Sequence, residues 1–139
     1  KIKVSSGYRS YTTQKGILAR NIEESKKNTS ISVAKAGYSE HQLGTAVDLT
    51  GTTVKNASAT VKFKDTPEDT WLEEHAVEYG FVQSYPENKI DITGYMYEAW
   101  HYRYVGIDNA KEIIKNGQTI NEFLKAKSEL EKEKSIITR

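Results

Sequence analysis

The chain has 139 residues, of which 37% are hydrophobic and 28% charged, a balance typical of a soluble globular domain and not of a disordered or membrane-embedded chain. Twenty lysines and arginines nearly cancel nineteen aspartates and glutamates, and a net charge of +1 excludes an electrostatic argument for nucleic acid or an anionic membrane as the partner. The absence of cysteine excludes thiol nucleophiles, disulfides and cysteine-ligated zinc, so any metal must be held by histidines and carboxylates.

The length predicts a single domain over residues 1–139 that buries a core without disulfide bonds. Because the chain opens without an initiator Met, we expect that an N-terminal part has been trimmed. Residues 1–4 alternate like a short strand and run into a turn, and residues 12–27 predict a helix with an apolar stripe opposite its charges. A polar connection leads to Gly37, after which residues 45–49 have the character of a strand.

The middle of the chain carries the clearest helix signals. Thr66 is a candidate N-cap, a proline follows at the first helical position, and Gly80 closes the predicted helix. Residues 81–83 begin a strand, and residues 90–104 predict a β-hairpin that bends at a Thr-Gly pair.

Two further helices are predicted in the C-terminal region, residues 107–139. The first covers residues 109–115 and is ended by a glycine. Thr119 and Glu122 have capping-box spacing at the start of the second helix, which runs into a charged tail. Strands and helices that mix without a regular βαβ order indicate the α+β class.

Two of the three histidines stand near carboxylates in two short stretches of the sequence. Catalytic zinc usually takes three protein ligands and leaves one position open, and His41, Asp48 and His101 supply that number. Glu98 would stay free to take a proton from a water molecule whose pKa the metal lowers to about 7. Spacing alone leaves a second interpretation open, in which the histidines are structural core residues and the aspartate caps a turn.

The order of the motifs resembles that of a known peptidase family. The pattern Ser39-x-His41-x-x-Gly44-x-Ala46-x-Asp48 is followed by Glu98-x-Trp100-His101-x-Arg103. Together they resemble the signature of the VanY-like D-alanyl-D-alanine carboxypeptidases, zinc peptidases that trim peptidoglycan stem peptides and include L,D-carboxypeptidases of the LdcB type. The remaining motifs of the family match residues 6–10, 79–81, 92–95 and 104–106, so the resemblance covers about residues 4–106.

The resemblance implies a role for each matching residue. It implies that Zn²⁺ is the cofactor, that His41, Asp48 and His101 are its ligands, and that Glu98 is the general base and acid. Arg9 would hold the terminal carboxylate of the substrate, because a guanidinium binds a carboxylate through two parallel hydrogen bonds. Gln14 and Ser39 would assist Arg9.

The resemblance also implies the fold, the reaction and the setting. The fold is expected to be of the Hedgehog/DD-peptidase type, an α+β domain in which a small antiparallel sheet forms a zinc groove with helices packed behind it. The partner is a peptidoglycan stem peptide, and the protein is expected to act as a monomer at an extracytoplasmic site on the bacterial surface or cell wall, without nucleic acid.

The motifs leave the cleaved bond open. D,D-carboxypeptidase activity, which removes the last D-alanine from a pentapeptide stem, is the preferred prediction. The first alternative is L,D-carboxypeptidase activity on a tetrapeptide stem. Two others are a non-catalytic cell-wall-binding module of the same fold and an endopeptidase of the phage-lysin kind, which would need no free carboxylate.

A few positions near the motifs carry their own expectations. Ser84 stands where many members of the family have arginine, so the way the stem peptide is held, and with it the specificity, is expected to differ from the family pattern. Ala99 stands where many have proline, so the Glu98 loop is expected to be less rigid. Arg103 is expected to anchor its strand through a carboxylate. Tyr95 and Tyr97 lie near the proposed site in sequence and are expected to line it. The tail over residues 129–134 is expected to be a solvated helix face.

Overall fold

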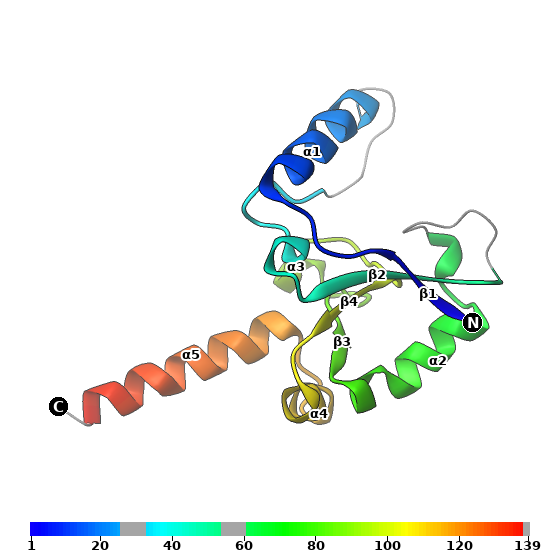
Figure 1. Cartoon of the computed structure of the whole chain (residues 1–139). Coiled ribbons are helices and arrows are strands. Elements are labelled where there is room, and N and C mark those ends of the chain that lie inside the picture. Colours follow the sequence, from blue (N-terminus) through cyan, green and yellow to red (C-terminus); the bar gives the residue numbers. More distant parts are fainter. Residues whose placement is uncertain (26–32, 54–60, 138–139) are drawn as a thin grey trace.

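A four-stranded antiparallel sheet lies at the centre of the structure, with the strand order β1-β2-β4-β3 (Figure 1). The structure is a computed structural model and describes residues 1–25, 33–53 and 61–137. The strands are β1 (Ile2–Ser6), β2 (Ala46–Gly51), β3 (Phe81–Gln83) and β4 (His101–Tyr104). The predicted α+β class and its small antiparallel sheet are confirmed.

The helices and helical turns follow one another around this sheet. They are α1 (Tyr11–Ser25), η1 (Glu40–Leu43), η2 (Val61–Phe63), α2 (Pro67–His75), η3 (Ala76–Tyr79), α3 (Ile90–Thr93), α4 (Ile107–Lys115) and α5 (Ile120–Ile137). In Figure 1, α1 lies on one side of the sheet, whereas α2 and α4 lie on the other.

One face of β2 packs into the core and the other faces the cavity, because successive side chains of a strand point to opposite faces of the sheet. Leu49 belongs to a buried apolar cluster with Leu72 and Ala76 from the α2–η3 segment and Tyr102 from β4. Asp48 points the other way, toward a cavity that α1 also lines. The sheet therefore separates the core under α2 from the groove that carries the candidate site, and the expected arrangement of groove and supporting helices is confirmed.

The capping signals of the sequence are confirmed in the structure. The Thr66 hydroxyl accepts a hydrogen bond from the Asp69 backbone N–H at 3.1 Å, as an N-cap does. Thr119 and Glu122 form the capping box: the Glu122 carboxylate accepts from the Thr119 N–H at 2.8 Å, and the Thr119 hydroxyl accepts from the Glu122 N–H at 3.2 Å. Glycine at position 80 ends the helical segment in the left-handed conformation, with φ of 80°.

The predicted hairpin over residues 90–104 is wrong in its first half. Residues 90–93 form the short helix α3, which Gly94 ends with φ of 77°. The Thr93 hydroxyl donates to the Lys89 carbonyl at 3.1 Å and accepts from the Tyr95 N–H at 3.2 Å, and these local bonds favour a closed turn over a strand. Only His101–Tyr104 is a strand, and its partners β2 and β3 are distant in sequence.

The strand predicted at residues 81–83 is found as β3 with the same bounds, and other predicted elements are found with shifted ends. The first strand extends to Ser6, the strand predicted over residues 45–49 extends to Gly51, and the helix predicted over 109–115 begins at Ile107. The last two residues of the helix predicted over 12–27 lie outside the described residues.

Helix α5 runs away from the sheet, as Figure 1 shows in orange and red. Its first turn is anchored, because Ile120 and Phe123 are buried against Ile113 of α4. Beyond that turn Leu130 is 52% exposed, and the predicted solvated face over residues 129–134 is confirmed. No helix within the described ranges has the combination of length and apolar character needed to cross a membrane.

Replacing Gly80 by alanine is predicted to destabilise the fold more than the same change at Gly117. Both glycines have positive φ, but a Cβ at Gly80 would meet the backbone of Gly106 and Ile107 at 2.9 Å, whereas one at Gly117 meets nothing within 4 Å. Gly117→Ala should cost about 1 kcal/mol and Gly80→Ala about 2–5 kcal/mol, because backbone atoms must also move. Urea unfolding of the two variants tests this, and equal losses would contradict it.

Candidate metal centre and active site

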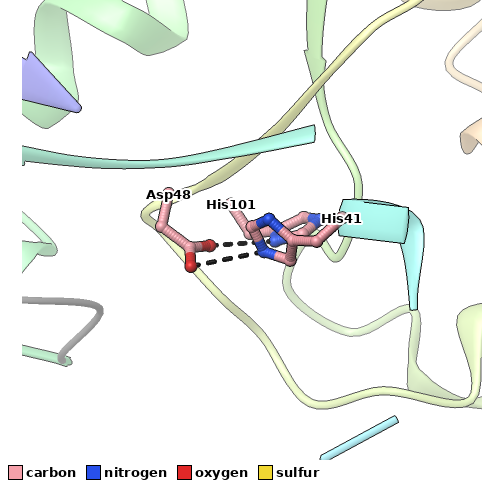
Figure 2. Close-up of side chains that lie close together, drawn as sticks. All are labelled: His41, Asp48 and His101. Carbon is pink, nitrogen blue, oxygen red and sulfur yellow. Dashed lines mark hydrogen bonds and ion pairs between the residues drawn. The ribbon is translucent and has the colours of Figure 1, made fainter. Parts of the chain in front are cut away.

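Three predicted ligands lie together at the edge of the groove (Figure 2). Asp48 of β2 and His101 of β4 are direct cross-strand partners in the sheet register, which places their side chains side by side. His41 comes from η1, which immediately precedes β2. Each of the three offers one ligand atom, these atoms lie within 4.8 Å of one another, and all three residues are buried.

The donor atoms fit a tetrahedral zinc site. Oδ2 of Asp48 lies 3.3 Å from Nε2 of His41, and Oδ1 of Asp48 lies 3.0 Å from Nδ1 of His101. Zinc–ligand distances of about 2.0–2.2 Å place neighbouring tetrahedral ligands about 3.4 Å apart, so each histidine already lies near that spacing from an oxygen of Asp48. The three ligand atoms lie within 4.8 Å of one another, so the set must close further to hold the ion. Two imidazoles and one carboxylate also match the ligand set of catalytic zinc, which leaves the fourth position open.

The two imidazoles are held in opposite orientations. His41 places Nδ1 2.7 Å from the Gly7 carbonyl oxygen, so Nδ1 carries the proton and Nε2 faces Asp48. His101 places Nε2 3.0 Å from a carboxylate oxygen of Glu40, so Nε2 donates there and Nδ1 faces Asp48. Each ring thus directs one nitrogen toward the common centre.

Glu40 is a site residue that the sequence analysis missed. It precedes the ligand His41 in the chain, but its contact with His101 joins residues 61 positions apart. Arg103 donates to Glu40 at 2.9 Å, which confirms the expectation that this arginine is bound to a carboxylate. Ser84 is buried and its hydroxyl donates to the same glutamate at 2.6 Å.

The carboxylates set the charge of the site in the absence of metal. Burial disfavours the imidazolium of His101, but hydrogen bonds to Asp48 and Glu40 and the negative charges of Asp48 and Glu98 outweigh it and raise the pKa of His101 to about 9. Burial alone would raise the pKa values of the two carboxyls, yet hydrogen bonds lower that of Asp48, chiefly from the two histidines, and lower that of Glu40 to about 2. The metal-free site therefore holds a protonated His101 between two carboxylates.

Glu98 lies beside the ligands without being one of them. Its Oε2 is 3.8 Å from Nδ1 of His101. Burial raises the pKa of Glu98 to about 7; the negative charges of Asp48 and Glu40 add to this, while His101 and Arg9 oppose it. The loop that carries Glu98 is fixed by its own backbone N–H, which donates to the Tyr85 carbonyl at 3.1 Å. A carboxyl that titrates near neutral pH suits a general base that later serves as an acid.

All of the predicted site residues line one open cavity of about 180 Å³. Besides the metal ligands and Glu98, its wall contains Arg9, Gln14 and Ser39. Tyr95 lines it too, as expected, whereas the expectation for Tyr97 is wrong for this cavity: that ring packs against the buried cluster under α2. Adjacent residues need not face the same way once the chain leaves a regular strand.

Arg9 and Gln14 have different surroundings in the cavity. Nη2 of Arg9 donates to Asp48 at 2.6 Å and to Ser6 at 3.0 Å, so the arginine pairs with a metal ligand in this arrangement. Gln14 is 1% exposed; its amide donates to the Ala34 carbonyl at 2.8 Å, while its Oε1 has no hydrogen-bond partner among the described residues. A buried acceptor without a partner at a cavity wall is suited to a ligand donor.

Comparison with known proteins identifies the family. Residues 1–107 match the sequence profile of VanY, the D-alanyl-D-alanine carboxypeptidases. The chain belongs to the VanY family. A D-alanyl-D-alanine carboxypeptidase of Enterococcus faecalis is 37% identical to it over 131 residues, which cover 87% of this chain and 46% of the relative. The chain spans 38–46% of the length of three curated relatives that it matches, the E. faecalis protein included.

Solved structures of the VanY family share the fold. The LdcB LD-carboxypeptidase superposes with a TM-score of 0.77 at 38% identity, over 90% of this chain and 58% of LdcB. A variant of the vancomycin-resistance D,D-pentapeptidase VanY, solved in complex with Zn(II), has a TM-score of 0.74 at 35% identity, over 88% of this chain and 71% of that protein. These similarities confirm the fold and family that the ordered motifs implied.

Zinc binding is predicted to release about one proton from His101. The raised pKa of about 9 means that both ring nitrogens of His101 are protonated at neutral pH, and Nδ1 must lose its proton to bind metal. Zinc affinity should therefore rise by about tenfold per pH unit up to pH 9 from this residue alone. Calorimetric titration in buffers of different ionisation enthalpy measures the proton count.

The half-exposed His75, which pairs with Glu78 on the surface, provides the control for this titration. His75→Ala should leave the number of released protons unchanged. Zinc binding without proton release near pH 7 would contradict the charge state assigned to His101.

Proposed function

We propose that the protein is a zinc-dependent carboxypeptidase that hydrolyses the terminal D-alanine from peptidoglycan stem peptides. The observation that carries this proposal is the joint presence, in one cavity, of the three metal ligands, the carboxyl of Glu98 and the guanidinium of Arg9. The metal ligands and the carboxyl of Glu98 supply the metal and the proton acceptor that peptide hydrolysis needs. The guanidinium of Arg9 supplies the positive charge that binds the carboxylate at the end of a peptide.

The hydrolytic step is assigned to Glu98 beside the ligand set. Zinc, when bound by His41, Asp48 and His101, supplies a Lewis acid that polarises a carbonyl and makes a water molecule acidic near neutral pH. Glu98 takes the proton of the attacking water and delivers it to the leaving amine. Burial raises the pKa of this carboxyl to about 7, and a carboxyl in that range is suited to take up and release a proton near neutral pH.

Recognition of the chain end is assigned to Arg9. Its guanidinium lies at the cavity wall with its side chain 21% exposed, so a ligand can reach it. A substrate carboxylate would compete with Asp48 for its hydrogen bonds, and the metal would compensate Asp48 in turn. Gln14 and Ser39 line the same wall and complete the pocket for the terminal residue.

Two cleavage specificities are supported by similar proteins. The E. faecalis relative is named a D-alanyl-D-alanine carboxypeptidase, and a similar solved structure is a D,D-pentapeptidase. LdcB, at 38% identity, is an LD-carboxypeptidase. We favour D,D-carboxypeptidase activity on pentapeptide stems, with L,D-carboxypeptidase activity on tetrapeptide stems as the alternative.

The setting belongs to the same proposal. A stem peptide of the cell wall lies outside the cytoplasmic membrane, so we place the protein at an extracytoplasmic site, acting as a monomer. The ligands, Glu98 and Arg9 are present together at the cavity, which argues against a non-catalytic binding module. The position of Arg9 beside the ligands argues against an endopeptidase, which meets no free carboxylate.

Replacing Glu98 by glutamine is predicted to lower kcat by about 10²–10⁴-fold, the range expected when a general acid–base is lost. Zinc binding should persist, because Glu98 is not among the three ligands. Release of D-alanine from a pentapeptide, followed by mass spectrometry, measures turnover, and metal analysis of the same sample measures zinc. Glu78→Gln on the surface is the matched control, and normal turnover by the Glu98 variant would contradict the assigned role.

Defined peptides are predicted to distinguish the substrates. The pentapeptide stem should lose its terminal D-alanine, whereas a pentapeptide with an amidated C-terminus should be cut at least tenfold more slowly, because Arg9 loses a charge-assisted contact. Product masses from penta- and tetrapeptides assign the bond. Cleavage of the tetrapeptide alone would identify the L,D alternative, and rapid cleavage of the amidated peptide would identify an endopeptidase.

A further inference from the structure

We propose that Glu40 is a positioning residue that orients His101 for metal binding, and that Ser84 and Arg103 hold Glu40 in place. This inference rests on the zinc site of the proposed function. It concerns the side of His101 that faces away from the ligand centre, where Nε2 meets Glu40 at 3.0 Å.

Both oxygens of Glu40 are occupied by donors. Oε2 accepts from Nε2 of His101 and from the hydroxyl of Ser84 at 2.6 Å. Oε1 accepts from Nη1 of Arg103 at 2.9 Å. The Glu40 side chain is 14% exposed, and a carboxylate at that depth is stable only when its oxygens are paired in this way.

The network joins three separate elements. Ser84 directly follows β3 and is 1% exposed, His101 and Arg103 lie two residues apart on β4, and Glu40 begins η1. Since the strand places residues 101 and 103 on the same face, one carboxylate reaches both side chains. The network therefore locks η1, which also carries His41, onto the sheet.

The His101 ring has little freedom in this network. Asp48 accepts from its Nδ1 at 3.0 Å, Glu40 from its Nε2 at 3.0 Å, and the ring of Tyr85 stacks on it with centroids 4.8 Å apart. When a metal takes the place of the Nδ1 proton, the hydrogen bond to Glu40 is the polar contact that continues to fix the orientation of Nε2, beside the stacked ring of Tyr85. A carboxylate at this position also makes the imidazole a more basic ligand.

The two ligand histidines differ in this respect. His41 is oriented by the neutral carbonyl of Gly7, whereas His101 is oriented by a charged carboxylate. Loss of a partner that orients a ligand histidine typically lowers metal affinity by about 10- to 100-fold. We expect that range for Glu40→Ala and a smaller loss, about threefold to tenfold, for Ser84→Ala, which removes one of the hydrogen bonds to Glu40.

The test measures zinc Kd by competition with a chromophoric chelator for the full chain and three variants, Glu40→Ala, Ser84→Ala and the control Glu78→Ala. The control is matched because Glu78 also contacts a histidine, His75 Nδ1 at 3.0 Å, which is not among the predicted ligands. Circular dichroism and thermal unfolding show whether each variant is folded. In the zinc-loaded protein, NMR of the imidazole N–H groups reports whether the Nε2 proton of His101 stays protected from exchange.

We expect Glu40→Ala to bind zinc most weakly, Ser84→Ala to bind it with intermediate affinity, and the wild type to bind it most tightly. Both site variants should lose the protection of the Nε2 proton of His101, and the control should match the wild type in both measurements. Wild-type Kd in both site variants, or an equal loss in the control, would overturn the proposal. If Glu40→Ala does not fold, Ser84→Ala decides by the same two readouts. A wild-type protein that binds zinc but cleaves no stem peptide would refute the proposed function alone, since neither readout depends on hydrolysis.

Discussion

The carboxylate of Asp48 is the interaction on which the rest of the site depends. It is 2% exposed and contacts both ligand imidazoles and the guanidinium of Arg9. A buried carboxylate without partners would cost several kcal/mol, so these groups must stay close to it in the folded protein. Two of these groups are imidazoles. Because they must stay beside the carboxylate in the folded protein, the three side chains are already gathered where a divalent cation can bind them.

The sheet supplies this arrangement through its register. Asp48 and His101 are opposite each other on neighbouring strands, and a shift of one residue in either strand would turn that strand's ligand toward the core under α2. Leu49 and Tyr102, their immediate neighbours in sequence, fill that core. The packing of the apolar residues on one face therefore determines the geometry of the polar residues on the other.

The short helix η1 connects the metal ligands to the groups around them. It carries His41 toward the ligand centre and Glu40 toward the far side of His101, so two adjacent residues act on opposite sides of one site. Gly44 ends the segment with φ of 74°, and β2 begins two residues later with the strand that carries Asp48. Small displacements of η1 would therefore affect both histidines together.

The amino-acid sequence by itself predicted the helix caps, because a cap depends on residue identity and on local spacing along the chain. It also predicted the ligand set, Glu98 and Arg9, through the order of the family motifs, since spacing alone left their roles open. The sequence pattern failed at residues 90–93, where a threonine hydroxyl closes a helical turn, and at Tyr97, which faces the core. The role of Glu40 and its contact with Ser84 could not be predicted beforehand, since these hydrogen bonds span 44 to 61 positions. Only the tertiary structure decides such contacts, because strand pairing and burial, which no local pattern encodes, bring those residues together.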